Sequence, residues 1–470
     1  MGLALVGMQA SGQPNALAQK PEVAGAIQVL DAWLQATVAS HEEPGLSIGI
    51  VYGNDLIWAK GYGYANVEKR IPATPATLYR IASISKVFTA TAILQLRDAG
   101  KLQLDDPVSK HLSWFRVKEP RADAPPITIW HLLTHTSGLA RELPAYYWND
   151  LKFPSREEMM RMVPEEPAVF APEVEYKYSN LGLAIAGEVV AAVSGEPYAQ
   201  YVEAHILRPL GMGATLVQPS ASAANMAVGY RRHATGEPRE AEDFIDARAL
   251  TPSAGLASNV EDLAKFVSLQ FRDGPAGGAQ ILKGPTLREM QRVQWLKPDW
   301  ASGQGLGFGI RHVGQQVRVG KDGAAPGYKT LMEWVPAEKF GVIVLINGYD
   351  SEPTTYVNQA LSIMGPAIAK ANPRPKAAPA MADPSWSKYV GTYTWKHVDT
   401  QIMIVDGELV MISLESASPW DQRVRLIPAG PNTFKMSGGG NNGEILTFEV
   451  DQTGTATRLN ASNYFRIRKK

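Results

Sequence analysis

Ser83 and Lys86 have the residue types and the spacing of a nucleophile and its proton acceptor. They fall at the start of a predicted helix, Ser85–Ala99, on which residues three apart are neighbours, about 5–6 Å between Cβ atoms. A neutral lysine amine can then take the serine proton, and the helix N-terminus favours the negative charge that develops beside it. The pair alone is weak evidence, because the tetrapeptide SWSK at 385–388 repeats the spacing and because serine is a common N-cap.

Two further short motifs lie downstream. Tyr178-Ser179-Asn180 leads directly into a predicted helix, Leu181–Val193, so that a phenol and an amide can be held at a cleft. Lys321-Asp322-Gly323 lies in a strand-like segment, where a glycine would let the backbone of a substrate approach closely. Y-x-N and K-x-G each recur elsewhere in the chain, so the order and the surroundings of the motifs carry the argument.

A distinctive block, WHLLTHTSGL at 130–139, lies between the first two motifs. Together with S-I-S-K, Y-S-N and K-D-G-A-A-P-G-Y, it resembles the serine β-lactamase and penicillin-binding-protein superfamily. The closest likeness is to the class C β-lactamase-like branch, which includes family VIII-type carboxylesterases, D-aminopeptidases and DD-peptidases. The resemblance covers roughly residues 22–370. It implies a serine hydrolase that forms an acyl-enzyme and cleaves an ester, a D-amino-acid amide or a β-lactam, expected in that order of preference.

The resemblance also implies a role for each motif residue. Ser83 matches the acyl-forming nucleophile, Lys86 its proton-accepting neighbour, and Tyr178 a general base and then acid. Backbone N–H groups of Ser83 and Ala324 match the oxyanion hole. The remaining substrate-binding positions are Asn180, which holds the acyl side chain or orients the lysine, and Lys321, Asp322 and Gly323 of the third motif. Two lysines converging on the phenol are expected to lower one another's pKa and that of Tyr178.

Asp322 departs from the family pattern. Relatives usually carry threonine, serine or another small residue there, and in β-lactamases this position helps to bind the antibiotic's carboxylate. An ionised Asp322 would repel that carboxylate, so we expect weak β-lactam hydrolysis and a preference for neutral esters or for substrates with a free amine. The alternative is that Asp322 points away from the cleft. His135, in the central block, is interpreted as structural.

The order of helix and strand patterns predicts an α+β fold for residues 21–370. An antiparallel sheet flanked by helices should join the two ends of this β-lactamase-like domain, with a mostly helical insert from about residue 108 to 260. Besides the helices named above, the predicted elements are a helix at Glu22–Ser40, strands at Leu46–Tyr52, Leu56–Gly61, Val317–Gly320, Leu331–Val335 and Val342–Ile346, and a final helix near Tyr356–Lys370.

The two ends of the chain are interpreted separately. Residues 1–20 are expected to be a flexible tail or a remnant signal peptide, since Ala16-Leu17-Ala18 resembles a cleavage site but no basic residue precedes Lys20. Residues 371–384 are rich in proline and alanine and are predicted to be a linker. Residues 385–470 resemble the small lipocalin-like β-barrel of some D-aminopeptidase-like members. Short strands separated by turns are predicted there at Val390–Trp395, Gln401–Val405, Glu408–Ile412, Val424–Pro428, Thr433–Met436, Ile445–Val450 and Tyr464–Ile467. That barrel can cap the cleft, or it can serve as an oligomerisation or surface-binding module.

Composition excludes several function classes. Lys and Arg total 46, as do Asp and Glu, so no nucleic acid partner is expected. The absence of cysteine excludes disulfides, Cys-ligated zinc and thiol catalysis, and there is no H-E-x-x-H motif, so no metal or cofactor is expected. No apolar run approaches the 18 or so residues of a transmembrane span. The expected location is periplasmic or secreted, otherwise cytoplasmic, and the oligomeric state stays open.

A rival function uses the same residues. A penicillin- or peptidoglycan-binding protein would acylate Ser83 but turn over negligibly, acting as a sensor or scaffold. Burst kinetics with no steady state would favour this rival over the hydrolase.

Overall fold

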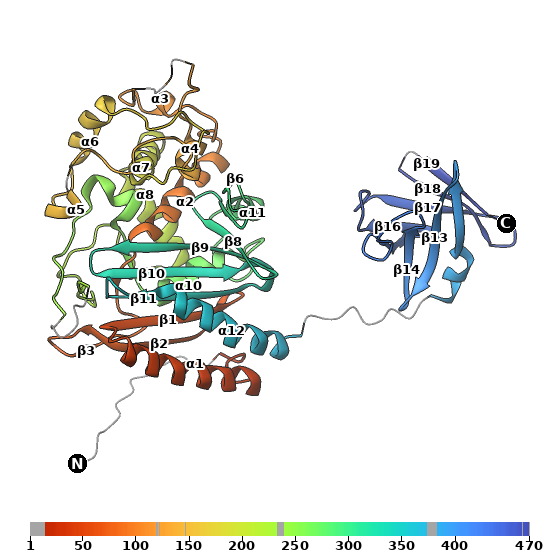
Figure 1. The fold of residues 1–470 in the computed structure, drawn as a ribbon, viewed down its shortest axis with the longest axis horizontal. Helices are drawn as coiled ribbons and strands as arrows, with labels where there is room; N and C mark the ends of the chain where they lie inside the picture. The colour runs from red at the N-terminus through yellow and green to blue at the C-terminus, as the bar shows by residue number, and fades with distance from the viewer. Residues whose placement is uncertain are drawn as a thin grey trace, which may run out of the picture. The chain divides into compact units, whose positions relative to one another are not determined.

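The computed structural model describes residues 15–118, 121, 123–145, 147–232, 239–373, 383–462 and 464–469. The chain divides into two compact units, Met1–Ala371 and Asn372–Lys470 (Figure 1). Most of the predicted tail, and the greater part of the predicted linker, lie outside the described residues.

A nine-stranded antiparallel sheet runs through the first unit, in the order β3-β2-β1-β11-β10-β9-β8-β7-β6. β1 pairs with β11, so that Leu46 lies opposite Ile346, and the two ends of the unit share one sheet as predicted. The strands of this unit are β1 Gly45–Tyr52, β2 Asp55–Asn66, β3 Ile71–Pro72, β4 Tyr79–Arg80, β5 Ala257–Ser258, β6 Trp295–Leu296, β7 Ser302–Gln304, β8 Gly309–Val313, β9 Gln316–Ala325, β10 Tyr328–Val335 and β11 Phe340–Ile346.

Helices pack on both faces of this sheet (Figure 1). They are α1 Pro21–Ser40, α2 Ser85–Asp98, α3 Val108–His111, α4 Ile129–Thr134, α5 Tyr147–Asp150, α6 Arg156–Met162, α7 Asn180–Ser194, α8 Tyr198–Val202, α9 Arg208–Leu210, α10 Val260–Leu269, α11 Gly284–Met290 and α12 Pro353–Ala371. On one face, α1 and α12 form a hydrophobic cluster with β1 and β11 that includes Leu30, Val344 and Tyr356. The predicted insert, residues 108 to 260, contains α3 to α9.

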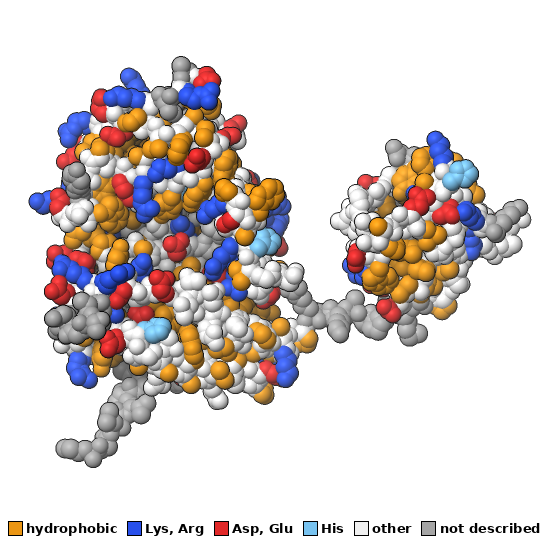
Figure 2. Space-filling model, in the orientation of Figure 1, with side chains coloured by type: hydrophobic (Ala, Val, Ile, Leu, Met, Phe, Trp, Pro, Cys, Tyr) orange, Lys and Arg blue, Asp and Glu red, His pale blue; other side chains and the backbone are white. Residues whose placement is uncertain are grey.

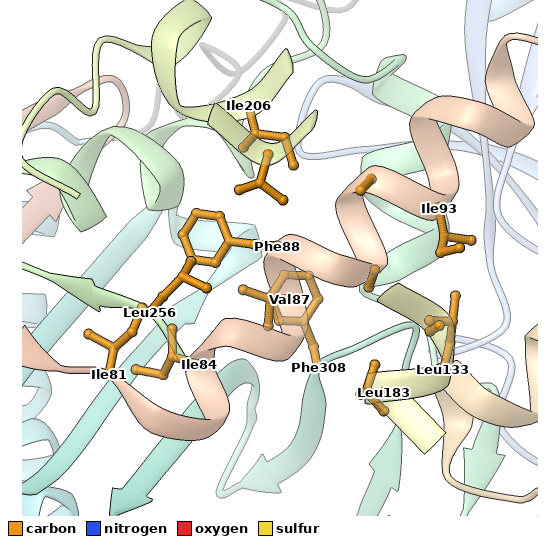
Figure 3. Close-up of a cluster of buried hydrophobic side chains, with 14 of the residues drawn as sticks. Ile81, Ile84, Val87, Phe88, Ile93, Leu133, Leu183, Ile206, Leu256 and Phe308 are labelled. Carbon is orange, nitrogen blue, oxygen red and sulfur yellow. The ribbon is translucent and has the colours of Figure 1, made fainter. Parts of the chain in front are cut away.

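The larger core lies on the opposite face, around α2. Val87, Phe88 and Ile93 of this helix are buried among side chains of the helical insert and of β8 to β10. Figure 3 shows how Phe308 and Leu133 approach the same helix from different segments. Because α2 is enclosed on nearly all sides, its first turn is held rigidly next to the sheet.

The two helix starts that carry the predicted site differ. α7 begins with an N-cap, since Ser179 Oγ accepts a hydrogen bond from Gly182 N at 2.9 Å. α2 is instead preceded by a short 3-10 turn, Ala82–Ile84, so Ser83 lies on that turn and Lys86 in the first turn of the helix.

The second unit contains a closed barrel of eight antiparallel strands. Tyr389, Phe434 and Phe448 fill its interior, and the rings of Tyr389 and Phe448 stack with centroids 4.5 Å apart. The strands are β12 Gly391–Trp395, β13 Val398–Val405, β14 Glu408–Ser413, β15 Val424–Gly430, β16 Thr433–Ser437, β17 Ile445–Val450, β18 Ala456–Ala461 and β19 Tyr464–Arg468. This confirms a small antiparallel β domain. Sequence patterns missed β18, because its buried positions are Ala456, Leu459 and Ala461 rather than β-branched or aromatic residues.

The surface matches the balanced composition. Figure 2 shows basic and acidic side chains interspersed over the visible face, with no large area of one sign. Among the described residues, no helix is long and apolar enough to span a membrane. Within those same ranges, no group of three or more His, Asp or Glu side chains is arranged to hold a metal ion.

Candidate active site

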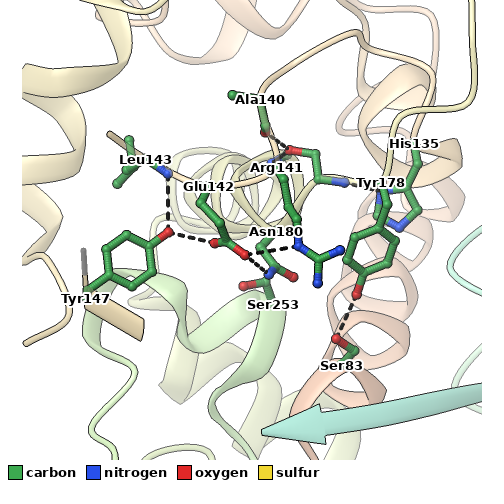
Figure 4. A network of polar contacts seen from close by, with 12 residues as sticks. Ser83, His135, Ala140, Arg141, Glu142, Leu143, Tyr147, Tyr178, Asn180 and Ser253 are labelled. Atoms are coloured by element: carbon green, nitrogen blue, oxygen red, sulfur yellow. Dashed lines mark hydrogen bonds and ion pairs between the residues drawn. The ribbon is translucent and has the colours of Figure 1, made fainter. Parts of the chain in front are cut away.

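Ser83 lies in a short chain of hydrogen bonds with the other two predicted catalytic residues. Its Oγ lies 2.7 Å from Tyr178 Oη (Figure 4). The same Oγ lies 3.1 Å from Lys86 Nζ. Tyr178 approaches from the loop before α7, whereas Ser83 and Lys86 come from the start of α2. Ala82, the residue before Ser83, has a φ of +45°, which non-glycine residues rarely adopt. The structure therefore brings together three side chains from motifs 95 residues apart.

Lys86 is buried, and three polar atoms accept hydrogen bonds from its ammonium group. Besides Ser83 Oγ, these are Asn180 Oδ1 and the Ser253 carbonyl oxygen, each at 2.7 Å. Ser253 belongs to a single π-helical turn, Thr251–Gly255. An ammonium has three donors, so all are satisfied and the group is fixed in place. Burial lowers the pKa of Lys86; Tyr178 opposes this effect.

Three cations surround the ring of Tyr178. Lys86 Nζ, Lys321 Nζ and Arg141 Cζ lie 5.0, 5.1 and 5.0 Å from its centroid. Burial alone would raise the pKa of Tyr178, but Lys86 and Lys321 outweigh burial and lower it to about 8. The predicted lowering for Lys321 is wrong: although burial lowers its pKa, the phenol of Tyr178 and the carboxylate of Asp322 raise it by more.

The ring of His135 packs against the ring of Tyr178. The centroids of the two rings are 4.5 Å apart, and His135 Nδ1 accepts a hydrogen bond from Ser179 N at 3.2 Å (Figure 4). Burial, together with nearby Lys321 and Lys86, holds the pKa of His135 well below its usual value, so the ring is neutral. These contacts position Tyr178 rather than supply a proton.

The third motif occupies an open edge of the sheet. The ladder between β8 and β9 ends at the pair Gly309 and Gly320, so among the described residues the stretch 321–325 pairs only with β10. The side chain of Asp322 is 77% exposed, and its carboxylate lies 3.9 Å from Lys321 Nζ. Asp322 thus places a negative charge beside the lysine, which is the arrangement that the repulsion argument requires.

Gly323 has a different neighbour from the one that we expected. A Cβ at this position would lie 2.2 Å from the Ile81 carbonyl oxygen and 2.5 Å from Thr330 Oγ1. The backbone that approaches Gly323 is therefore the segment that leads to Ser83. The absence of a side chain at Gly323 lets β9 pack directly against this segment.

Ala324 lies at the edge beside this segment. A two-residue turn joins β9 to β10, with Ala325 opposite Tyr328 and Ala324 opposite Lys329. Because bonded and non-bonded pairs alternate and the pair closing such a turn is bonded, the N–H of Ala324 points toward the open edge. This direction suits an oxyanion donor.

Sequence reasoning missed several groups of the site. Arg141 stacks on Tyr178, and Glu142 lies next to Asn180. Both lie within three residues after the T-S-G-L block, and this proximity is the only sequence signal for them. The Ser253 carbonyl carries no side-chain signal at all. Tyr176, whose pKa burial raises, stands against Lys297, with Nζ 4.6 Å from its ring centroid.

Another serine has the spacing of a nucleophile elbow, G-x-S-x-G at 45–49. Ser47 is buried within β1, and its Oγ lies 2.7 Å from the Thr74 carbonyl oxygen and 2.9 Å from Tyr79 Oη. An elbow needs a strand-to-helix turn, so Ser47 is a structural residue.

The sequence matches the Beta-lactamase family model over residues 30–361, well over half of the chain. The chain belongs to the beta-lactamase family. This membership confirms the resemblance drawn from the motifs, and it supports serine hydrolase activity in general.

Individual relatives of this beta-lactamase family member differ in how much of this chain, and of their own length, the alignment covers. "Protein flp" of Staphylococcus aureus strain MW2 is 32% identical over 245 residues, 52% of this chain and 49% of the relative, so the chain spans about half the length of that protein. The D-alanyl-D-alanine-carboxypeptidase/endopeptidase AmpH of Escherichia coli is 28% identical over 70% of this chain and 85% of its own.

Solved structures show the same fold. An octameric penicillin-binding protein homologue from Pyrococcus abyssi has a TM-score of 0.64 at 25% identity, covering 94% of this chain and all of its own. A class C beta-lactamase (TM-score 0.62) and the hydrolase EstCE1 (0.61) are each 22% identical and cover 73% of this chain and 98% of theirs.

Proposed function

We propose that the protein is a serine hydrolase that forms an acyl-enzyme on Ser83. The observation that carries this proposal is the 2.7 Å contact between Ser83 Oγ and Tyr178 Oη, in a site whose two lysines lower the pKa of the phenol to about 8. A phenolate held at that distance can remove the serine proton without moving.

Acylation follows from these positions. Ser83 Oγ attacks the substrate carbonyl carbon while its proton passes to Tyr178. The tetrahedral oxyanion is held by the backbone N–H groups of Ser83 and Ala324. The bond to the leaving alcohol or amine then breaks, and the leaving group takes the proton from Tyr178. In this scheme Lys86 does not take the serine proton itself, in contrast to the role expected from its motif. Lys86 and Lys321 stay protonated and stabilise the phenolate form of the tyrosine.

Deacylation reverses the roles with water. A water molecule gives a proton to Tyr178 and attacks the ester carbonyl of the acyl-enzyme. The ester bond to Ser83 breaks, the serine recovers a proton from Tyr178, and a carboxylic acid leaves.

We propose neutral esters as the preferred substrates, ahead of D-amino-acid amides and β-lactams. The support is Asp322, whose exposed carboxylate lies 3.9 Å from Lys321 Nζ, where a cation could otherwise bind a substrate carboxylate. A substrate with a free amine would be tolerated for the same reason.

The test is stopped-flow hydrolysis of p-nitrophenyl acetate and butyrate, with a D-alanyl anilide and nitrocefin alongside. The proposal expects a burst equal to the enzyme concentration followed by steady turnover, fastest on the esters. A burst without turnover would support the rival acylating binder instead, and the absence of both would refute the proposal.

A further inference from the structure

Glu142 lies behind the catalytic lysine, on the far side of Asn180. Its Oε1 accepts a hydrogen bond from Asn180 Nδ2 (Figure 4). On the other side of the amide, Asn180 Oδ1 accepts a hydrogen bond from Lys86 Nζ at 2.7 Å. The amide of Asn180 thus bridges a carboxylate and an ammonium group, two partners of opposite charge.

This bridge has only one workable orientation. If the Asn180 amide were flipped, its NH₂ would face the ammonium of Lys86, and its oxygen would face the carboxylate of Glu142. Both contacts would then pair donor with donor or acceptor with acceptor. A carboxylate at 142 therefore determines which end of the amide meets Lys86.

Glu142 is itself fixed. Tyr147 Oη donates to its other oxygen, Oε2, at 2.6 Å, and the same hydroxyl accepts a hydrogen bond from Leu143 N at 3.2 Å (Figure 4). The ring of Tyr147 is fully buried against the ring of Phe153, with centroids 4.9 Å apart. Because these contacts hold the Glu142 side chain in one conformation, its carboxylate can fix the position of a group that it contacts.

We propose that Glu142 is a positioning residue for catalysis: through the amide of Asn180 it holds the ammonium of Lys86 against Ser83. This inference rests on the proposed function, because the position of Lys86 matters only if Ser83 is the nucleophile. Glu142 touches no reacting atom.

The charges around Lys86 support this role. Burial lowers the pKa of Lys86, and Lys321 lowers it further, whereas Tyr178 and Glu142 raise it. The charged neighbour of Glu142 itself is Arg141, whose guanidinium lies 3.5 Å from Oε1 but is 63% exposed. Removing the charge at 142 leaves Lys86 less stable in its protonated form.

The test compares Glu142→Gln with Glu188→Gln, a matched control. Glu188 is similarly buried, lies further along α7 than Asn180, and pairs with Arg156 at 2.7 Å. We expect Glu142→Gln to lower kcat about tenfold with KM almost unchanged, the loss typical of one hydrogen bond to a charged group. The control should keep the wild-type kcat.

The pKa of Lys86 gives a readout independent of turnover. In protein labelled with ¹³C at the lysine ε-carbon, with the signal assigned by its loss in Lys86→Met, Glu142→Gln should titrate at a lower pH than the wild type. A wild-type kcat together with an unchanged Lys86 titration would overturn the role of Glu142. A wild type that hydrolyses nothing would refute the proposed function, while the titration would still decide on Glu142.

A double-mutant cycle tests the route through the amide. In an Asn180→Ala background, Glu142→Gln should change kcat less than about twofold, because the link is already broken. A tenfold loss in both backgrounds would overturn that route. Should Glu142→Gln fail to fold, Tyr147→Phe replaces it: kcat should fall about threefold, because the Glu142 carboxylate loses one of the hydrogen bonds that fix it but keeps its contact with Asn180, and a wild-type kcat would overturn the proposal.

Discussion

Tyr178 Oη lies 2.7 Å from Ser83 Oγ, while the ring of the same tyrosine lies about equally far from Lys86 and Lys321, at 5.0 and 5.1 Å. The phenol therefore contacts the hydroxyl of the proposed nucleophile, and its ring lies near two cations. We therefore expect the rate of the reaction to depend on whether Tyr178 is a phenol or a phenolate.

The pH profile should show this control. Because Tyr178 has a pKa of about 8 and acts as phenolate, kcat/KM for p-nitrophenyl acetate should fall about tenfold per pH unit below 8 and level off above it. Tyr178→Phe should lose about 10²- to 10⁴-fold in kcat, the usual contribution of a general base. A profile that is flat from pH 6 to 9 would contradict the assignment of Tyr178 as the base.

Removing Lys86 should move that profile. Lys86→Met takes away the cation that most lowers the pKa of Tyr178, so the remaining activity should rise only above pH 8, with kcat/KM about 100-fold lower at pH 7.5. Lys388→Met is the control, because Lys388 belongs to the second S-x-x-K and lies on a 3-10 helix of the barrel unit, Pro384–Tyr389. Equal activity in both variants would count against Lys86.

Asp322 should set substrate preference. Asp322→Thr removes the carboxylate that lies 3.9 Å from Lys321 Nζ. The substrate carboxylate of nitrocefin is then no longer repelled, so hydrolysis of nitrocefin should rise about tenfold relative to that of p-nitrophenyl acetate. Asp322→Asn removes the charge at nearly constant size and should give part of the gain. No gain in either variant would show that repulsion by Asp322 does not limit β-lactam hydrolysis.

Gly323 should tolerate no side chain. In Gly323→Ala the new Cβ would meet the Ile81 carbonyl oxygen, so β9 or the turn carrying Ser83 must shift, at a cost of about 1–3 kcal/mol of unfolding free energy and with lower kcat. Gly309→Ala, in the neighbouring strand β8, is the matched control, since its Cβ would meet only the Gly320 oxygen at an ordinary 3.7 Å. The measurements are the thermal melting temperature and the ester turnover of both variants. Equal stability of the two variants would refute the close contact between Gly323 and the Ile81 backbone.

Sequence patterns predicted the fold well where periodicity is strong. The helix α1 and the buried strand β11 match their predicted ranges to within a few residues, and the α+β sheet that joins both ends was expected from the element order. β18 was missed because alanine contributes little hydrophobic signal to a strand.

Only those residues of the site that belong to short side-chain motifs could be predicted from the sequence. Ser83, Lys86 and Tyr178 stand in short motifs, and the structure places them together. The Ser253 carbonyl acts through its backbone, and Glu142 acts through an amide, so neither leaves a motif. The direction of the pKa shift of Lys321 was wrong because the phenol of Tyr178, and after it the carboxylate of Asp322, raise this pKa by more than burial lowers it, and motif spacing does not give the balance of these effects.

The most direct test of the central claim is the mass of the protein after brief acid quenching with p-nitrophenyl butyrate, for wild type, Ser83→Ala and Ser385→Ala. Ser385 is the serine of the second S-x-x-K and belongs to the barrel unit. We expect a butyryl adduct on the peptide containing Ser83 in wild type and in Ser385→Ala, and neither adduct nor turnover in Ser83→Ala. Undiminished turnover by Ser83→Ala would show that Ser83 is not the nucleophile.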